Sequence, residues 1–216
     1  MTLEHDHGAH DHDEHDEHAG HDNGDHAGHE HVPYPDAVAN YRSEKDEYFR
    51  LAPESPLAAG DRATFSGLPY FAVDESLRFE ELALEPYAGS EPAQFQIPTS
   101  DGKLRDAKRA GIFRFEINGV RHALTGYTFA RGASDSVFVP FLDGTSGRES
   151  YGAGRYLDLY PEHDGTYALD FNLAYHPSCV YDARFSCPLT PAENRLPIRI
   201  EAGERLAADG LTAAHG

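Results

Sequence analysis

The chain is poor in lysine and has no long apolar run, and both features limit what it can bind. Only three of its 216 residues are lysine, whereas 37 are aspartate or glutamate, and the formal net charge is -19. Phosphate contacts need clustered lysine and arginine, so this composition argues against a nucleic-acid surface. No apolar stretch approaches the roughly 18 residues that a membrane-spanning helix requires. We therefore expect neither nucleic acid nor membrane as a partner.

A secretory signal is also missing from the sequence. The first residues have neither a basic region nor an apolar region of the required kind, which makes the cytoplasm the expected location. Many acidic residues combined with few lysines are typical of proteins adapted to concentrated salt, where self-repulsion is screened over short distances. A halophilic source is the preferred interpretation, and an ordinary acidic cytoplasmic protein is the alternative.

Cysteine is scarce, and its spacing excludes two common motifs. Cys179 and Cys187 are eight residues apart, which fits neither the C-x-x-C redox motif nor the paired-cysteine zinc pattern. The two residues predict a disulfide, or two reduced side chains packed as small apolar groups. A zinc site formed with His176 is the third interpretation. No phosphate-binding loop or G-x-S-x-G nucleophile elbow is present.

The first 31 residues form a low-complexity segment with a chemistry of its own. They hold ten acidic residues and no lysine or arginine, and no apolar residue recurs at helical or strand spacing, so we expect disorder. Imidazole and carboxylate groups suit zinc, nickel, copper and cobalt, and a flexible chain can gather several of them around one ion. A solvating acidic tail with incidental histidines is the alternative. The candidate metal ligands of this tail are His5, His7, His10, His12, His15, His18, His21, His26, His29 and His31.

The rest of the chain predicts one domain that begins with a helix. We expect a tail over residues 1–34, a single β-rich domain over 35–206 and a flexible C-terminus over 207–216. Start signals at Pro35 and Asp36 predict a helix over 36–51, and a short helical turn is expected over 57–65. The side chains expected on one face of the first helix are Val38, Tyr41, Lys45, Tyr48 and Phe49.

Beyond residue 70 the apolar residues alternate with polar ones, which is typical of β-strands. Asn118-Gly119 is the strongest hairpin signal, because both residues readily adopt the positive φ of a tight turn. Successive hairpins without long helices between them predict an antiparallel meander, forming a barrel or sandwich of about eight or nine strands. The predicted strands cover residues 77–85, 93–99, 103–108, 111–117, 120–129, 136–142, 151–160, 166–173 and 195–201.

The stretch 138–194 contains the candidate binding residues. Gly152 and Gly154 are two apart in a predicted strand, a spacing that favours close approach of another backbone or of a ligand, or a bend or bulge in the sheet. Arg155 is suited to bind a carboxylate or phosphate, or else to pair with an acidic neighbour. The segment 143–147 is either a turn, which is favoured, or an anion-binding nest. The candidate ligand-binding residues are Asp143, Thr145, Ser146, Tyr151, Arg155, Tyr156, Asp170, Asn172 and Tyr175.

Three functions are consistent with these residues. The first, which we prefer, is a β domain that binds a small molecule in a polar pocket. The second is a hydrolase-like enzyme in which Asp143 or Asp170 acts as acid or base and Arg155 holds an anionic substrate. The third is a metal storage or chaperone protein that acts through the histidine-rich tail. The sequence leaves the ligand, any reaction and the oligomeric state open.

Four segments together resemble a known family. They are S-P-L to G-L-x-Y-F over 55–71, F-V-P-F to Y-G-A-G-R-Y-L-D-L over 138–159, D-F-N-x-A-Y-x-P-x-C to C-P-L-x-P-x-E-N over 170–194, and I-x-A-G-E over 200–204. This pattern is similar to an uncharacterised family of bacterial and haloarchaeal proteins, domain of unknown function 1684. The resemblance covers about residues 40–205 and implies no reaction. Two departures are His176, where the family typically has asparagine, and Thr190, where it often has proline.

Overall fold

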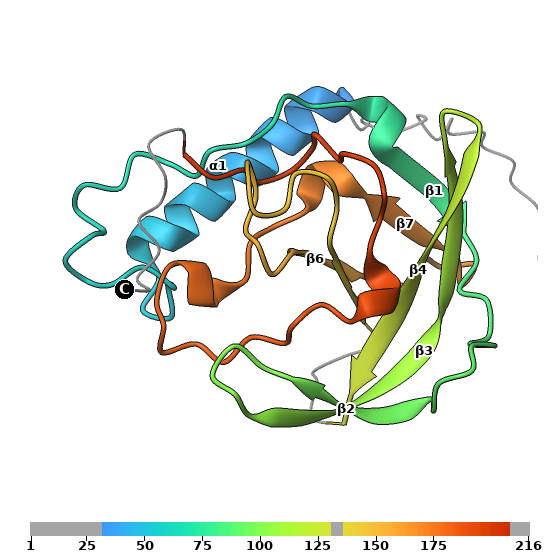
Figure 1. The fold of residues 1–216 in the computed structure, drawn as a ribbon. Helices are drawn as coiled ribbons and strands as arrows, with labels where there is room; N and C mark the ends of the chain where they lie inside the picture. The colour runs from blue at the N-terminus through green and yellow to red at the C-terminus, as the bar shows by residue number, and fades with distance from the viewer. Residues whose placement is uncertain (1–31, 131–135, 208–216) are drawn as a thin grey trace, which may run out of the picture. The chain divides into compact units, whose positions relative to one another are not determined.

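The computed structural model of the chain describes residues 32–130 and 136–207 (Figure 1). The histidine-rich segment 1–31 and residues 208–216 lie outside these ranges, so the predicted tail and its metal ligands stay predictions. The described part is mainly β, as predicted. Its elements are α1 (Tyr34–Leu51), β1 (Arg78–Leu82), β2 (Gln94–Pro98), β3 (Leu104–Ile117), β4 (Val120–Phe129), β5 (Val137–Phe141), β6 (Arg155–Leu159) and β7 (Tyr167–Asp170), with short 3-10 turns η1 (Glu75–Leu77), η2 (Phe171–Leu173), η3 (Ser178–Val180) and η4 (Ala192–Asn194).

Five strands form an antiparallel meander in the order β2-β3-β4-β5-β6. The β3–β4 hairpin turns at Asn118 and Gly119, whose φ angles of 51° and 76° are those of a tight hairpin turn. Ile117 pairs with Val120 directly beside the turn, and the register continues to Ala107 opposite Phe129. The hairpin expected from Asn-Gly is therefore confirmed.

The second sheet consists of β1 and β7, which pair antiparallel. Apolar side chains from both sheets share one core, in which Leu169 of β7 and Phe113 of β3 are completely buried. Among the described residues the sheets do not close into a barrel, and the arrangement fits a sandwich. Burial of the apolar face of each sheet against the other holds the two sheets together.

Several strand predictions differ from the structure. Residues 103–108 and 111–117 belong to the single strand β3, whose register shifts between Arg109 and Gly111. Residues 171–173 form the 3-10 turn η2, and 195–201 contribute only an isolated bridge between Leu142 and Arg195. The described part therefore has seven strands, rather than eight or nine. Apolar and polar residues alternate along these segments, but this alternation does not show whether a neighbouring strand is present to pair with them.

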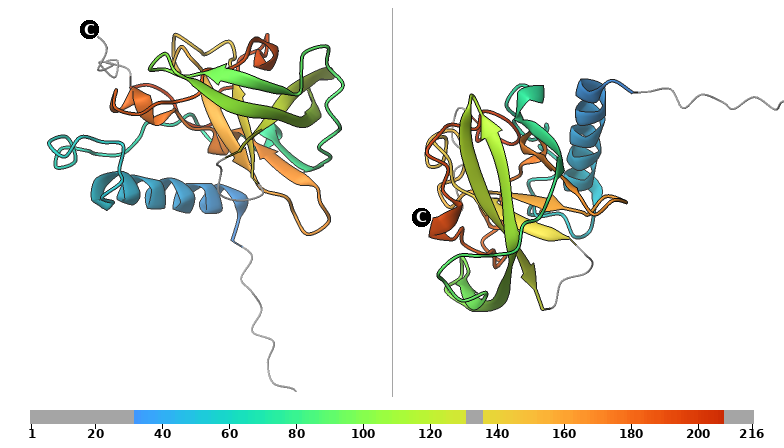
Figure 2. Two further views of the ribbon diagram at one scale, coloured as in Figure 1. Left: turned by 90° about the horizontal axis from the view of Figure 1, so that it is seen from below. Right: turned by 90° about the vertical axis from the view of Figure 1, so that its right-hand side faces the viewer.

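Helix α1 begins at Tyr34, two residues before the predicted start and at the last residue of the predicted tail, and it ends at Leu51, as predicted. Its buried residues are Val38 and Phe49, whereas Tyr41 and Tyr48 are 38% and 47% exposed, so the predicted contact face is only partly correct. The Phe49 ring meets the edge of Tyr181, with ring centroids 5.0 Å apart. The two views of Figure 2 place α1 on the side of the domain away from β3 and β4. Within 57–65, where a helical turn was expected, residues 59–64 form consecutive turns.

Strands β4 and β5 are joined in an unusual way. They pair directly at only one position, Tyr127 opposite Phe138. Beyond this pair the side chain of Asn194 bridges the two strands. Its NH2 group donates to the carbonyls of Thr125 and Pro140, and its oxygen accepts from the Thr125 N–H. Figure 1 shows η4, which carries Asn194, beside β4. One side chain thus replaces backbone pairing between two strands.

No helix in residues 32–130 and 136–207 has the length and apolar character needed to cross a membrane.

Candidate functional site

The nine predicted ligand-binding residues do not share one pocket. Four of them form a polar network against residues 200–204, in which three side chains are buried and Ser146 is half-buried. Two lie in an aromatic cluster with the cysteines. Of the remaining three, two line a cavity and the third is buried behind it. The three groups are Asp143, Thr145, Ser146 and Arg155; Tyr151 and Tyr156; and Asp170, Tyr175 and Asn172.

Arg155 lies at the start of β6 and is completely buried. Its guanidinium donates to the backbone carbonyls of Ile200 (2.7 Å), Ala202 and Glu204 (3.1 Å). It also lies 3.4 Å from the carboxylate of Asp143. These contacts use the donors that an anionic ligand would need. Arg155 therefore binds the C-terminal segment of its own chain, and the structure does not bring it to a cavity.

Asp143 is the acidic partner in the same network. Its carboxylate accepts hydrogen bonds from the Thr145 backbone N–H and hydroxyl, from the Ser146 hydroxyl and from the Ile200 N–H. The segment is a tight turn organised around a buried carboxylate, so of the two interpretations of 143–147 the turn fits. With its oxygens engaged in this way, Asp143 is poorly placed to act as a general base.

Gly152 and Gly154 belong to a separate turn before β6, in which the Gly154 N–H donates to the Tyr151 carbonyl. Gly152 and Gly154 precede the strand, which begins at Arg155, so they do not share a strand face as expected. Gly154 has φ of 104°, and a Cβ there would lie 2.5 Å from the carbonyl oxygen of Phe141. Only glycine fits this close approach of two backbones.

The predicted metal site around the cysteines is not assembled. His176 accepts the Tyr151 N–H at Nε2 (3.2 Å), and its Nδ1 lies 3.5 Å from Glu204. Both ring nitrogens therefore face protein groups. Cys179 and Cys187 are reduced and buried side by side, with the Cys179 N–H 3.3 Å from the Cys187 sulfur. In the part of the chain that the structure describes, no three His, Cys, Asp or Glu side chains are grouped as metal ligands.

Glu204 is the centre of a buried polar cluster that the sequence did not indicate. It is 1% exposed, and it accepts hydrogen bonds from the His176 backbone N–H (2.7 Å) and the Tyr181 hydroxyl (3.0 Å). The ammonium of Lys45 lies 2.6 Å from its other oxygen. Lys45 comes from α1 and His176 from the segment before η3, so this carboxylate ties the helix to the sheet domain. A buried carboxylate needs such partners because burial removes the water that would otherwise bind it.

His176 makes the domain sensitive to acid. Burial disfavours the imidazolium and lowers the pKa of His176 from 6.5 to about 4. The unfolded chain therefore takes up a proton at a higher pH than the folded protein, and stability is lost as the pH falls from 6.5 towards 4. We expect His176→Asn to remove this contribution. Between pH 7 and pH 4.5 the free energy of unfolding should therefore fall by about 2–3 kcal/mol less in the variant than in the wild type.

Urea unfolding at the two pH values measures this difference. His163→Asn is the matched control, because His163 is exposed in a turn and should leave the acid loss unchanged. If the free energy of unfolding falls equally in His176→Asn and in the wild type between the two pH values, His176 is not the source of the acid sensitivity.

A cavity between α1, β6 and β7 contains the two remaining predicted residues. We call it the tyrosine–carboxylate cavity; its volume is about 460 Å³. Three tyrosines and three carboxylates surround an aliphatic lining, and none of the lining residues is basic. The lining residues are Tyr41, Tyr160, Tyr175, Asp158, Glu162, Asp170, Leu157, Leu159, Leu173 and Ala168.

The three carboxylates of this cavity differ in what already binds them. Asp170 accepts from Tyr34 (2.6 Å) and from the backbone and side chain of Asn172, so both its oxygens are used. Asp158 accepts the Tyr175 hydroxyl through one oxygen. Within the described residues the second oxygen of Asp158 and the side chain of Glu162 have no hydrogen-bond partner. These two groups are the ones that can meet a ligand.

Asn172 is not part of this cavity. It is completely buried, and its amide group bridges the backbone N–H and carbonyl of Asp74, both at 2.8 Å. It fixes the segment before β1 against the end of β7. The expected convergence of Arg155, Asp170 and Asn172 on one cavity is therefore not observed.

Sequence reasoning missed Tyr41, Asp158 and Glu162 as lining residues. Asp158 and Tyr160 alternate with Leu157 and Leu159, which was a signal for a polar face of β6. No local signal brings Tyr41 of α1 to that face.

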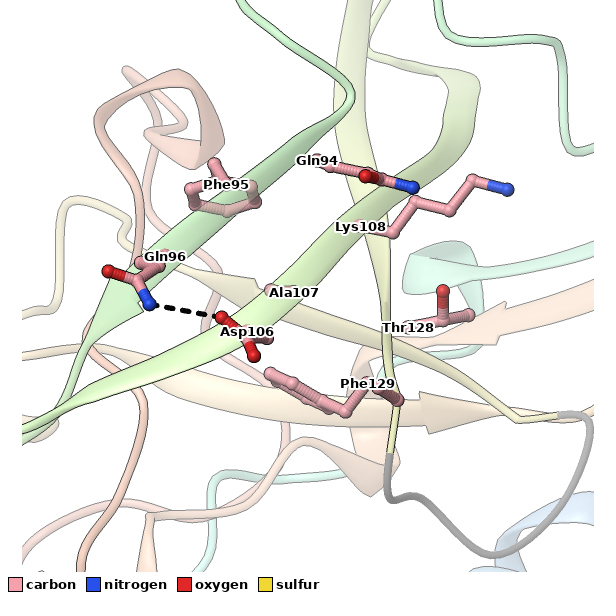
Figure 3. Close-up of a pocket in the computed structure, with 9 residues that line it drawn as sticks. Gln94, Phe95, Gln96, Asp106, Ala107, Lys108, Thr128 and Phe129 are labelled. Carbon is pink, nitrogen blue, oxygen red and sulfur yellow. Dashed lines mark hydrogen bonds between the residues drawn. The ribbon is translucent and has the colours of Figure 1, made fainter.

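A second cavity of about 530 Å³ lies over β2, β3 and the end of β4 (Figure 3). Gln94 and Lys108 extend from paired positions on neighbouring strands, and Gln96 donates to Asp106 (3.0 Å). Phe95 and Phe129 contribute the aromatic part of its lining. None of the predicted site residues lies in this cavity, which is shallow and of mixed charge.

Fold and site together define a class: a mainly β domain with two antiparallel sheets, a polar interior that serves the fold and a separate tyrosine–carboxylate cavity. The chain belongs to the family described as protein of unknown function (DUF1684), whose model matches residues 63–205. The resemblance seen in the sequence is thereby confirmed.

One solved structure similar to this chain is the solution NMR structure of an uncharacterized protein from Haloarcula marismortui. It has 35% sequence identity and a TM-score of 0.60, and the match covers 81% of this chain and 95% of that one. A search of curated proteins finds no match.

Proposed function

We propose that the protein binds a small organic cation in the tyrosine–carboxylate cavity. The observation that carries this proposal is the lining itself: three tyrosine rings and three carboxylates, with no lysine or arginine among the lining residues. Aromatic faces and carboxylates both attract a positive charge, and together they form the usual recognition surface for alkylammonium groups. A volume of about 460 Å³ suits a ligand of metabolite size.

The domain already contains one such contact. The ammonium of Lys45 lies 4.6 Å from the centre of the Tyr175 ring. The rings of Tyr41 and Tyr160 are more exposed and are available to a ligand on the open side. In this arrangement Asp158 and Glu162 pair with the charge, while the half-buried Leu173 packs against the alkyl groups.

The test compares choline and spermidine with 3,3-dimethylbutanol, a neutral molecule of the same shape as choline. We expect calorimetric titration to detect binding of at least one cation and none of the neutral compound, because the carboxylates act only on charge. Asp158→Asn should weaken cation binding about tenfold, which corresponds to about 1.4 kcal/mol.

Asp106→Asn is the matched control, because Asp106 is an exposed carboxylate in the other cavity. The proposal fails if neither cation binds at millimolar concentration, or if choline and its neutral analogue bind equally. Loss of binding in Asp106→Asn but not in Asp158→Asn would move the site to the cavity over β2 and β3.

A further inference from the structure

The aromatic cluster beside β5 and β6 contains both cysteines of the protein. Cys179 and Cys187 are 2% and 8% exposed, and Tyr151, Tyr156 and Phe185 belong to the same cluster. The Cys179 N–H lies 3.3 Å from the Cys187 sulfur, so the two side chains are neighbours in the folded protein. The chain has only two cysteines, so any reaction of a thiol in this protein takes place at this pair.

The backbone on each side of the pair is held in place. Cys187 exchanges hydrogen bonds with Ser100: its N–H donates to the serine hydroxyl (3.0 Å), and its carbonyl accepts the serine N–H (2.8 Å). Cys179 lies within the turn η3, in which the Val180 N–H donates to Pro177 (3.0 Å). Two thiols fixed in contact lose little freedom when they become bonded.

We propose that Cys179 and Cys187 form a reversible disulfide when the folded protein meets a hydroperoxide. The thiolate of Cys179 attacks one peroxide oxygen; a sulfur–oxygen bond forms, the oxygen–oxygen bond breaks, and hydroxide leaves and is protonated to water. The sulfur of Cys187 then attacks the sulfenic acid of Cys179, forms the disulfide and releases a second water. Two thiols and one hydrogen peroxide thus become one disulfide and two waters.

The surroundings of the pair favour this chemistry and limit the oxidant. A hydrogen bond from the Cys187 thiol, with further ones from Ser100 and Tyr151, lowers the pKa of Cys179, whereas the same contact raises the pKa of Cys187. Such contacts increase the thiolate fraction on which nucleophilic attack depends. Burial of both sulfurs excludes bulky disulfides from direct attack, but hydrogen peroxide is about as small as water.

The experiment treats the full-length reduced protein with one equivalent of hydrogen peroxide and then alkylates it under denaturing conditions. We expect a monomer that has lost about two daltons and takes up no alkylating groups, with both thiols restored by dithiothreitol. The disulfide should also raise the melting temperature by about 5 °C, because it constrains the unfolded chain.

Cys187→Ser separates the two steps. Without a resolving thiol, Cys179 should stop at the sulfenic acid and be labelled by dimedone, which the oxidised wild type should not be. The proposal is overturned if the treated wild type still carries two alkylatable thiols, if the product is a disulfide-linked dimer, or if the cysteines pass to sulfinic acid without bonding. The wild-type result stands even if the variant does not fold.

Discussion

Arg155→Met is expected to lower the free energy of unfolding by about 4 kcal/mol, the range found when one partner of a buried ion pair is removed. The arginine is completely buried between β6 and the C-terminal segment, where it donates to three backbone carbonyls. Methionine fills much of the same volume but donates no hydrogen bond. The carbonyls of Ile200, Ala202 and Glu204 would lose these donors, and the charge of Asp143 would stay buried without its counterion.

Urea unfolding followed by circular dichroism measures this loss. Arg199→Met is the matched control: Arg199 pairs with Glu149 and Glu201 at the surface, where ion pairs contribute about 0–1 kcal/mol. The double variant Asp143→Asn, Arg155→Met should lose less than the sum of the two single variants, because it leaves no uncompensated charge. Similar, small losses in Arg155→Met and Arg199→Met would refute the structural role of this side chain.

Asn194→Ala is expected to cost a similar amount, about 4 kcal/mol, since each buried backbone group left without a partner costs about 1–3 kcal/mol. The side chain makes three hydrogen bonds, two of them to Thr125 of β4 and one to Pro140 of β5. Beside these contacts the two strands have a single direct pair. Loss of the side-chain amide would therefore separate β4 from β5, the neighbouring strands of the sheet with the fewest direct pairs.

Hydrogen exchange at the Thr125 amide gives a local test, because Asn194 is its acceptor. Protection of this amide should fall in Asn194→Ala, whereas it should remain in Gln96→Ala, which removes an exposed amide from β2. Wild-type stability in Asn194→Ala together with full protection of Thr125 would show that β4 and β5 hold together without the asparagine.

Arg155 illustrates why the sequence predicted the fold better than the site. The sequence marks Arg155 as chemically unusual and predicts either a ligand-binding group or a partner for an acidic neighbour. Its acceptors lie 45 to 49 residues later in the chain, at the end of the predicted strand 195–201 and just beyond it. A side chain built to bind an anion and one built to bind backbone carbonyls have the same sequence signature. Their difference lies in the position of distant backbone.

The tyrosine–carboxylate cavity also shows that local sequence does not determine which residues come together in a site. Asp170 and Tyr175 were predicted as ligand-binding residues and do line it, but Asn172, between them in the chain, points to the backbone of Asp74. Residues 171–173 form a 3-10 turn in place of a continued strand, so the expected alternation of faces ends at Asp170. A short change of backbone conformation thus separated residues that the strand pattern had grouped.

The sequence by itself determined the features that depend on neighbouring residues. It predicted the helix after Pro33 and Pro35, the hairpin at Asn118-Gly119 and the mainly β class, because allowed φ angles and side-chain alternation are local properties. It also indicated the family.

Tertiary structure alone decided which polar groups are consumed by the fold. Burial removes water as a hydrogen-bond partner, so Arg155, Asn194 and Glu204 must satisfy groups brought from distant parts of the chain. The cavity of tyrosines and carboxylates is formed where α1 meets β6 and β7, and it exists only once those elements have packed.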